Sequence, residues 1–263
     1  MLNKENLLKK FSKIDDKLFI SKMLDRALRA EKIRSSVFSD FMDPHHAKLI
    51  ETAFSEMAEV NYIVDGGYPG AERVIVIFRP DFMSGDSDHE ELPIKLVHIA
   101  LKSRENLNHR DYLGALMGLG IKREKIGDIL VREDFCDVLA FEDIAEYIAY
   151  NLDKVGNARV EVELKDLEDL QALEPKTREI KTTVASLRLD SVASSGFGIS
   201  RSKMADYIKA EKVNLNWEVT DNLTKQVKEG DTISIRGKGR VVVHQVSGTT
   251  KKGRIGIVLK KLL

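Results

Sequence analysis

Apolar residues recur at helical spacing through the first sixty residues of the chain. The pattern predicts three helices, marked by Leu7, Leu8 and Phe11, by Leu18, Met23, Leu24 and Leu28, and by Leu49, Ile50, Phe54 and Met57. The third helix should begin at Asp43-Pro44, because an acidic N-cap followed by proline at the first helical position favours a helix start. Residues 1–70 are therefore predicted to form a helical amino-terminal domain.

From residue 73 the pattern changes to short β-rich runs separated by helical segments. Strands are predicted at residues 74–78, 94–100, 126–131, 137–140 and 158–164, and helices near residues 109–119 and 141–152. The order β-β-α-β-β-α-β is typical of an α+β domain of the ferredoxin-like or RNA-recognition-like type. We assign residues 71–165 to this middle domain. The fold hosts many functions, so it does not decide the function by itself.

A polar, acid-rich segment, residues 166–181, contains Pro175 and is predicted to be a linker. Beyond it, helices are predicted near residues 187–195 and 200–210, and strands at residues 212–217, 232–236, 240–246 and 254–259. Residues 182–263 form the third predicted domain. The predicted fold class of the whole chain is therefore α+β.

The composition, with 43% hydrophobic and 32% charged residues, is that of an ordinary globular protein. No apolar run reaches the ~18 residues of a membrane-spanning helix, and the amino terminus lacks the apolar segment of a signal peptide. We therefore expect a cytoplasmic protein without membrane insertion. Cys136 is the only cysteine, which excludes an internal disulfide and a paired-cysteine zinc site. We predict that Cys136 is a buried core residue rather than a nucleophile.

The net charge of zero conceals two oppositely charged parts of the chain. Residues 176–263 contain 18 Lys or Arg against 8 Asp or Glu, which leaves 24 basic and 34 acidic residues for the remainder. Such asymmetry indicates a polyanion-binding carboxy-terminal part joined to a part with another task. Chance segregation of solvated charges is the alternative.

The carboxy-terminal part contains a pattern suited to phosphate binding. Gly196 and Gly198 lie between two predicted helices, where a tight turn favours glycine. Ser200 is then predicted to be an N-cap, and the free N–H groups and dipole of the following helix favour an anion. Arg201, Ser202 and Lys203 follow in the first turn and add side-chain donors.

Glycines also alternate with cations in the run Arg236-Gly237-Lys238-Gly239-Arg240. Glycine lets a backbone approach a ligand closely, while Arg and Lys supply positive charge. A solvated hairpin is the alternative interpretation of this run. The candidate RNA-binding residues are Arg188, Ser200, Arg201, Ser202, Lys203, Lys209, Lys212, Arg236, Lys238 and Arg240.

Several motifs in this order make the segment resemble the S-four RNA-binding domain. They are R-L-D on a first helix, S-R-S-K at the start of a second, V-N-L-N after it, and then G-D-T-I-S-I-R-G-K-G-R. The resemblance implies binding to structured RNA. The sequence departs from the pattern at Glu211 and Trp217, where such domains commonly carry glycine.

The whole chain resembles the bacterial YlmH family, in which a helical part and an α+β part precede an S-four domain. The shared residues are Phe41-Met42-Asp43-Pro44, the segment 109–120, Arg123, Gly127-Asp128-Ile129 and Asn216-Trp217. The resemblance implies a ribosome-associated protein that acts on large subunits still carrying peptidyl-tRNA. The partners expected from it are therefore ribosomal RNA, the large ribosomal subunit and peptidyl-tRNA, while the oligomeric state stays open.

A second candidate RNA site surrounds the predicted helix of residues 109–119. His109 and Arg110 open this helix, and Asn106 and Asn108 are possible caps before it. A purely structural helix start is the alternative. The residues of this second candidate site are Arg104, His109, Arg110, Lys122 and Arg123.

No enzyme motif is complete. His109-Arg110-Asp111 matches the start of a kinase catalytic loop, but Leu116 stands where that loop needs asparagine. Gly114, Gly118 and Gly120 lack the dinucleotide-binding spacing and are predicted to permit helix packing and a turn. Arg188-Leu189-Asp190 echoes the catalytic aspartate motif of pseudouridine synthases, yet it lies within the predicted binding domain.

Metal binding is not indicated either. His45 and His46 are adjacent on a predicted helix and are expected to be surface residues, and the acid-rich loop 86–91 with His89 lacks ligand spacing. We therefore expect no catalytic residues, no metal and no cofactor. The alternatives to a non-enzymatic RNA-binding protein are an RNA-modifying enzyme, of pseudouridine synthase or methyltransferase type, and a cell-division adaptor.

Overall fold

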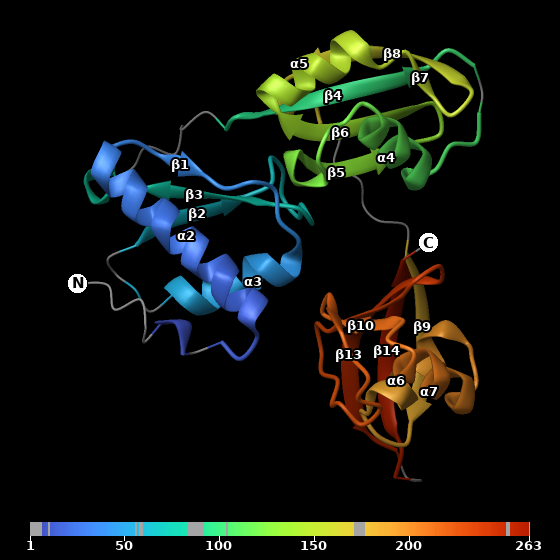
Figure 1. Cartoon of the computed structure of the whole chain (residues 1–263). Coiled ribbons are helices and arrows are strands. Elements are labelled where there is room, and N and C mark those ends of the chain that lie inside the picture. The colour runs from blue at the N-terminus through green and yellow to red at the C-terminus, as the bar shows by residue number, and fades with distance from the viewer. Residues whose placement is uncertain are drawn as a thin grey trace. The chain divides into compact units, whose positions relative to one another are not determined.

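The chain divides into two compact units, Met1–Leu173 and Glu174–Leu263. Figure 1 shows both in a computed structural model of the whole chain. The structure describes residues 7–262, apart from residues 10, 56, 58–59, 84–91, 104, 171–176 and 251–252. The acidic loop with His89 therefore lies outside the described residues. No helix among the described residues is long and apolar enough to cross a membrane.

The first unit begins with two helices that pack on a small antiparallel sheet (Figure 1). The helices are α2 (Ile14–Ile33) and α3 (Pro44–Phe54), and the strands are β1 (Val37–Phe38), β2 (Asn61–Asp65) and β3 (Ile75–Arg79). The strand order is β1-β3-β2. The amino-terminal part is therefore not helical throughout, and β3, which was expected in the middle domain, belongs to this first sheet.

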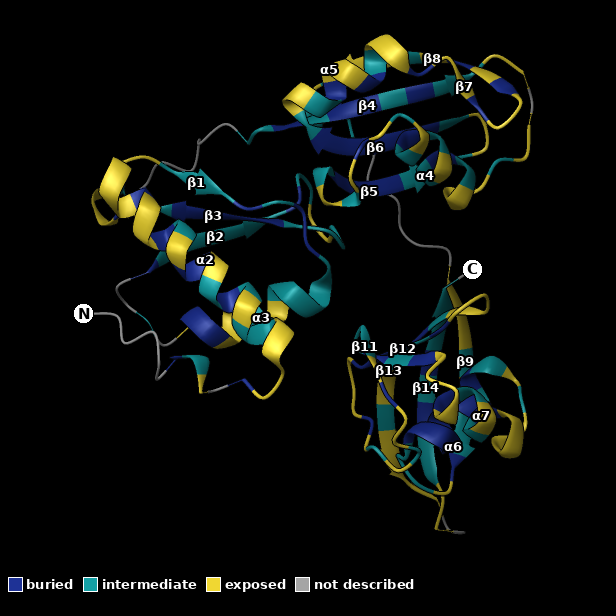
Figure 2. Ribbon diagram, in the orientation of Figure 1, coloured by how far each residue is buried: buried dark blue, intermediate teal, exposed yellow. Residues whose placement is uncertain are grey.

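Strand β3 is apolar at successive positions because both of its faces are covered. Val76 and Phe78 pack against α2 and α3, whereas Ile75 and Ile77 pack against strands of the middle domain. Figure 2 shows the strand dark blue over most of its length. The predicted boundary at residue 70 falls in the loop between β2 and β3, so it separates two strands of one sheet.

Helix α3 begins as predicted. Asp43 caps it by accepting the backbone N–H of His46 at 3.0 Å, and proline occupies the first turn. The two histidines are less exposed than expected, because the His46 ring contacts Phe19 and bonds Asp43 at 2.8 Å, while His45 lies 3.5 Å from Asp16. Burial opposes ionisation of Asp43, but the His46 hydrogen bonds outweigh it and lower the pKa of Asp43 to about 2.

The middle domain has the expected ferredoxin-like topology. Its elements are β4 (Ile94–Leu101), α4 (His109–Gly118), β5 (Ile126–Val131), β6 (Phe135–Phe141), α5 (Glu142–Asn151), β7 (Lys154–Val155) and β8 (Ala158–Lys165). The strands are antiparallel in the order β5-β6-β4-β8-β7. Three short 3-10 helices are associated with this domain. η1 (Asp81–Met83) precedes β4, η2 (Arg123–Lys125) lies between α4 and β5, and η3 (Leu167–Asp169) follows β8.

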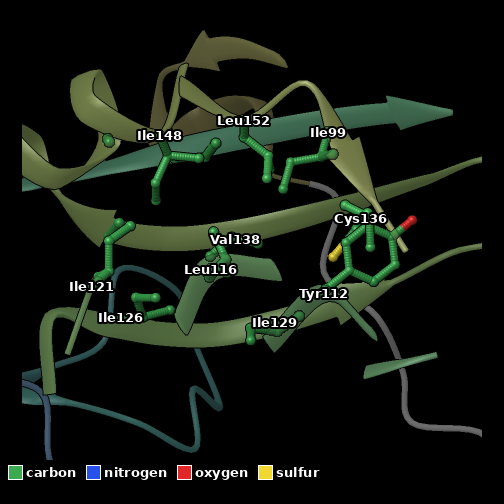
Figure 3. Packing of buried hydrophobic residues seen from close by; sticks show 14 of the residues in the cluster. Ile99, Tyr112, Leu116, Ile121, Ile126, Ile129, Cys136, Val138, Ile148 and Leu152 are labelled. Carbon is green, nitrogen blue, oxygen red and sulfur yellow. The ribbon is translucent and has the colours of Figure 1, made fainter. Parts of the chain in front are cut away.

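Helices α4 and α5 cover one face of this sheet and enclose a hydrophobic core (Figure 3). Tyr112 and Leu116 of α4 and Ile148 of α5 have no exposed surface. Cys136 is also buried, which confirms the prediction of a core cysteine, and burial raises the pKa of its thiol. A protonated, enclosed thiol is a poor nucleophile.

Two of the motifs that carry the family resemblance, residues 41–44 and 127–129, meet where the first sheet contacts the middle domain. Asp128 accepts hydrogen bonds from the Tyr68 hydroxyl at 2.7 Å and from the backbone N–H groups of Glu72 and Arg73 at 2.7 and 3.0 Å. The Arg73 guanidinium donates to the Phe41 carbonyl at 3.0 Å. A Cβ on Gly127 would lie 2.8 Å from the Phe41 ring. These motifs therefore join the two sheets of the first unit.

The second unit is a two-layer α+β structure with an antiparallel sheet. Its elements are β9 (Thr177–Val184), α6 (Leu189–Phe197), α7 (Arg201–Lys209), β10 (Val213–Leu215), β11 (Glu218–Val219), β12 (Thr232–Ile235), β13 (Gly239–Thr249) and β14 (Ile255–Leu262). The strands form one sheet in the order β11-β10-β12-β13-β14-β9. Helices α6 and α7 pack on one face through a shared apolar core (Figure 1).

Strand β9 shortens the predicted linker of residues 166–181. Its residues pair with β14 from Thr177↔Leu262 to Val184↔Ile255, so the linker prediction was wrong from Thr177 onward. At its other end, Leu167 and Leu170 pack on the core between the two sheets of the first unit. Between these ends, residues 171–176 lie outside the described residues.

Candidate nucleic-acid interface

The turn between α6 and α7 is built by two glycines with different roles. Gly198 ends α6 with a φ of 65°, the left-handed conformation predicted for it. Gly196 instead lies inside α6 against the sheet, where a Cβ would come within 2.8 Å of the Val241 side chain. The first glycine therefore permits the turn, and the second permits close packing of the helix.

Ser200 caps α7 as predicted, since its hydroxyl accepts the backbone N–H of Lys203 at 3.3 Å. The Ser200 and Ser202 hydroxyls lie 3.2 Å apart. Arg201, Ser202 and Lys203 are all exposed around this helix start, which contains no acidic residue in its first turn. The helix dipole and these side chains together provide a positive site for a phosphate.

A buried carboxylate positions two of the cations. Asp190 in the first turn of α6 is only 7% exposed. It accepts the Arg201 guanidinium at 2.5 Å and the Arg188 Nε at 3.3 Å. Both arginines remain half exposed, with 52% of the Arg201 side chain and 39% of the Arg188 side chain accessible. They can therefore keep donors for a ligand while one side of each guanidinium is held.

A second group of cations lies at the other end of α7. The β12–β13 turn uses Gly237 and Gly239 at φ values of 80° and 88°. Its Arg236 N–H donates to the Lys212 carbonyl at 3.3 Å, and the Lys238 ammonium lies 5.7 Å from the centre of the Tyr207 ring on α7. The turn therefore lies against the carboxyl end of α7, and Lys209 is exposed beside it.

We call these two groups the helix-side surface. Its members are Arg188, Ser200, Arg201, Ser202, Lys203, Tyr207, Lys209, Lys212, Arg236 and Lys238. The two groups are separated along α7 by roughly 12 Å, from the rise per residue of an α-helix. A surface of this length and charge can contact more than one phosphate of an RNA backbone.

Arg240, which the sequence analysis grouped with these residues, lies on another face of the unit. Its neighbour Val241 is buried under the helices, and successive residues of a strand point to opposite faces. Arg240 pairs in register with Ser234, which is half-buried on the same outer side of the sheet. Arg240 therefore lies on the sheet face opposite α6 and α7.

Sequence reasoning missed two contributors to the helix-side region. Tyr207 supplies an aromatic ring beside Lys238, and Lys261 of β14 places its ammonium 5.8 Å from the centre of the Phe197 ring at the end of α6. Tyr207 lies within a helix already singled out for its cations, so an aromatic residue there was a usable signal. Lys261 is remote in sequence, and only the sheet brings it to α6.

The second candidate site is not assembled as predicted. His109 and Arg110 begin α4, whereas Lys122 follows its other end, so the exposed cations are separated by the length of the helix. Arg123 turns inward and donates to the carbonyls of Ile126 and Gly127 at 2.6 and 3.0 Å. Burial and the neighbouring Arg73 lower its pKa to about 10. Arg104 lies outside the described residues.

The start of α4 is also less suited to an anion than predicted. Asn108 is the cap, accepting the Arg110 N–H at 2.9 Å, and Asp111 accepts the Asn108 N–H at 2.8 Å. This capping box puts a carboxylate at the backbone N–H groups, which leaves the exposed side chains of His109 and Arg110 as the groups that can contact RNA there. Gly114 and Gly118 do not serve close packing, because a Cβ at either would meet nothing within 4 Å among the described residues.

Comparison with known proteins identifies three family regions. The model described as the YlmH N-terminal region matches residues 15–82, the one described as a putative RNA-binding domain in YlmH matches residues 87–169, and the S4 domain model matches residues 187–233. The match of the middle model begins after β3, in agreement with the structure, in which the middle domain begins with β4. The last match contains α6, α7 and the start of β12, which hold most of the helix-side surface.

Two relatives extend this comparison. The ribosome-associated protein quality control protein P2 of Bacillus subtilis (strain 168) is 35% identical over 250 residues, which cover 94% of this chain and 95% of that protein. The solved structure of cell division protein ylmH from Streptococcus pneumoniae has a TM-score of 0.52 and 22% identity, and it covers 61% of this chain and 98% of that one. The second similarity is evidence for the fold alone.

Proposed function

The chain belongs to the YlmH family, and from this premise we propose that it binds structured ribosomal RNA, without catalysis, through the helix-side surface of its S-four domain. The observation that carries the proposal is the arrangement at the start of α7. There, buried Asp190 holds Arg188 and Arg201 beside a capped helix start that also bears Lys203. Fixed cations at a helix N-terminus are suited to phosphate oxygens.

The same geometry argues against the rival enzyme. A catalytic aspartate must reach a substrate, whereas Asp190 is buried and both of its oxygens are engaged by arginines. Its position supports a structural role within α6. Nucleoside analysis of ribosomal and transfer RNA incubated with the protein, with and without a methyl donor, distinguishes the two classes.

The proposed target is the large ribosomal subunit that retains peptidyl-tRNA, in the cytoplasm. It is supported by the name of the Bacillus relative, which describes a ribosome-associated quality control protein, and by the resemblance to YlmH proteins. The S-four domain supplies affinity for ribosomal RNA. The middle domain, whose matching model is described as putative RNA-binding, recognises the retained peptidyl-tRNA.

A role in cell division is the second candidate, since the Streptococcus protein of the same fold is named a cell division protein. The two readings differ in what the helix-side surface does. An adaptor that acts through protein contacts alone does not need Lys203 for its binding, whereas the RNA-binding proposal does.

Lys203→Glu tests the proposal most cleanly. Lys203 is exposed and its side chain is not part of the Asp190 cluster, whereas replacing Arg201 would leave a buried carboxylate with one partner fewer. We expect binding of the full chain to a ribosomal RNA hairpin to weaken about tenfold. The slope of log affinity against log salt should fall by about 1 for the lost phosphate contact.

The matched control is Lys48→Glu, which changes an exposed lysine of α3 and the net charge by the same amount. Filter binding or fluorescence anisotropy over a salt series gives both quantities, and circular dichroism checks the fold. The proposal fails if the two variants bind RNA with the same affinity and salt dependence.

A further inference from the structure

The sheet of the carboxy-terminal unit has a second face. Val241 and Val243 of β13 and Ile257 and Leu259 of β14 are buried under α6 and α7, so the residues that alternate with them point to the other side. We call that side the open face. Its residues on β9, β13 and β14 are exposed or half-buried, and they are Glu179, Lys181, Thr183, Arg240, Val242, Gly256, Val258 and Lys260.

The three strands that form most of this face are strongly basic. Four Lys or Arg lie on the open face, namely Lys181, Arg240, Lys260 and Arg254, which directly precedes β14, whereas Arg178 and Lys261 of the same strands lie on the helix side. The only acidic residue within these described strands is Glu179. All three strands lie outside residues 187–233, the part that matches the S4 domain model. The positive charge of the open face is therefore carried by strands outside the part that matches the S4 domain model.

The sheet register places the cations close together. Lys260 of β14 lies directly opposite Glu179 of β9, and Lys181 lies two residues further along β9, opposite Val258. Lys181 bonds Glu179 at 3.0 Å. The pKa of Glu179 is lowered by this hydrogen bond and by the charge of Lys181, with a smaller effect of Lys260, so the two lysines lie beside a single carboxylate.

Arg254 extends the cationic row at one end of the sheet. Its guanidinium donates to the Thr183 hydroxyl at 2.9 Å and to the Thr183 carbonyl at 2.5 Å. Two anchored hydrogen bonds hold this long side chain along β9 rather than free in solvent. Half-buried Val242 and Val258 lie between the charged positions. The face thus combines cations with apolar surface. It has more Lys and Arg side chains than carboxylates, since Glu179 is its one acidic residue among the described positions of these strands.

We infer that the open face binds the phosphate backbone of a second RNA segment, so that one carboxy-terminal unit holds two RNA segments on opposite faces of a single sheet. The inference rests on the proposed function, which places the first segment on the helix-side surface. A polyanion is the partner that this excess of cations over one carboxylate fits. The sheet itself keeps the two phosphate chains apart.

The test counts RNA molecules bound by the full chain. A short RNA hairpin is added in excess, and the molar ratio is measured by native mass spectrometry and by sedimentation at low salt. The open-face variant carries Lys181→Glu with Lys260→Glu, and a milder version carries glutamine at both positions in case charge reversal impairs folding. The matched control carries Lys32→Glu with Lys48→Glu, two exposed lysines of the first unit.

We expect two hairpins per chain for the unaltered protein and the control, and one for both open-face variants. Lys203→Glu should also weaken one of the two binding events by about tenfold. A single hairpin on the unaltered protein, or two on the folded open-face variants, overturns the inference. Loss of binding to anionic lipid vesicles in those variants, with two hairpins retained, would identify a membrane surface instead and also overturn it.

The two proposals fail in different ways. If the unaltered protein binds one hairpin and Lys203→Glu weakens it, the proposed function stands and the open face is not an RNA site. If Lys203→Glu has no effect while the open-face variants lose RNA, the open face is the RNA site and the helix-side surface is not.

Discussion

Glu211 holds a backbone conformation that side chains rarely adopt. It follows α7 with a φ of 54°, and Asn216 and Trp217 in the β10–β11 hairpin have φ values of 52° and 65°. The S-four resemblance departs from glycine at Glu211 and Trp217, and the structure shows that both positions keep the left-handed turn that glycine would serve. A non-glycine residue there costs ~1–2 kcal/mol.

Glu211→Gly should therefore stabilise the carboxy-terminal unit. Relief of strain outweighs the extra flexibility of glycine in the unfolded chain, and we expect a gain of about 0.5–1 kcal/mol. Urea unfolding followed by Trp217 fluorescence measures it, because this is the only tryptophan of the chain. Ala210→Gly is the control, since Ala210 has a φ of −84° and should lose stability. Equal shifts in both variants would contradict the strain argument.

Local signals predicted several single residues correctly. The Asp43 and Ser200 caps and the Gly198 turn depend on neighbours within three or four residues, which a sequence displays directly. The link between Asp190 and Arg201 joins residues eleven positions apart, and Arg123 turns inward because of Ile126 and Gly127. Such contacts depend on packing, so charge and spacing alone misjudged which cations remain available.

Strand β9 shows the limit of pattern reading for whole elements. It is the edge strand of its sheet and pairs with β14 alone, and only Ile180 and Val184 point into the core. Its other positions are polar, so its sequence resembles that of a linker. Only the pairing with β14 shows that the segment is a strand. The buried strands β4 and β5, with long apolar runs, were predicted nearly to their ends.

The helices contain glycines that should respond oppositely to alanine. A Cβ at Gly114 of α4 meets nothing within 4 Å, whereas at Gly196 of α6 it would lie 2.8 Å from Val241 and 3.2 Å from Leu259. Gly114→Ala should stabilise the first unit by about 1 kcal/mol through helix propensity. Gly196→Ala should destabilise the second by overpacking, by ~1–3 kcal/mol. Urea unfolding followed by circular dichroism, with Trp217 fluorescence for the second unit, measures both.

This pair also tests why α4 carries an exposed glycine. If Gly114→Ala fails to raise stability, the side chain meets something that the described residues do not include. If it raises stability, the glycine has no packing role in the isolated protein. Gly196→Ala must lower stability in either case, because the side chains that its Cβ meets, those of Val241 and Leu259, belong to the same unit.

At the scale of the whole chain, the family motifs divide into structural and binding groups. Phe41, Gly127 and Asp128 lie where the first sheet meets the middle domain and hold one unit together. The motifs of the second unit lie at the start of α7 and in the β12–β13 turn, among exposed cations. Sequence resemblance identified both groups, but only the contacts show that the first group is turned inward.

The proposed division of labour predicts a preference that only the full chain possesses. The first unit is acidic overall, so RNA should repel it except at local cations such as His109 and Arg110, which are exposed at the start of α4. The full chain should therefore prefer large subunits carrying peptidyl-tRNA over empty ones. Residues 174–263, which retain β9 and their own core, should bind both particles with similar affinity.

Alanine at His109 and Arg110 together should reduce the preference of the full chain more than its basal binding, since basal binding is assigned to the other unit. Lys122→Ala is the control, because Lys122 lies beyond the opposite end of α4. Co-sedimentation with purified subunits, with and without peptidyl-tRNA, gives both affinities. Equal binding of the full chain to the two particles would defeat the division of labour and leave the helix-side surface as the site for ribosomal RNA. An equal loss in both alanine variants would move the recognition site from the start of α4 to the helix as a whole.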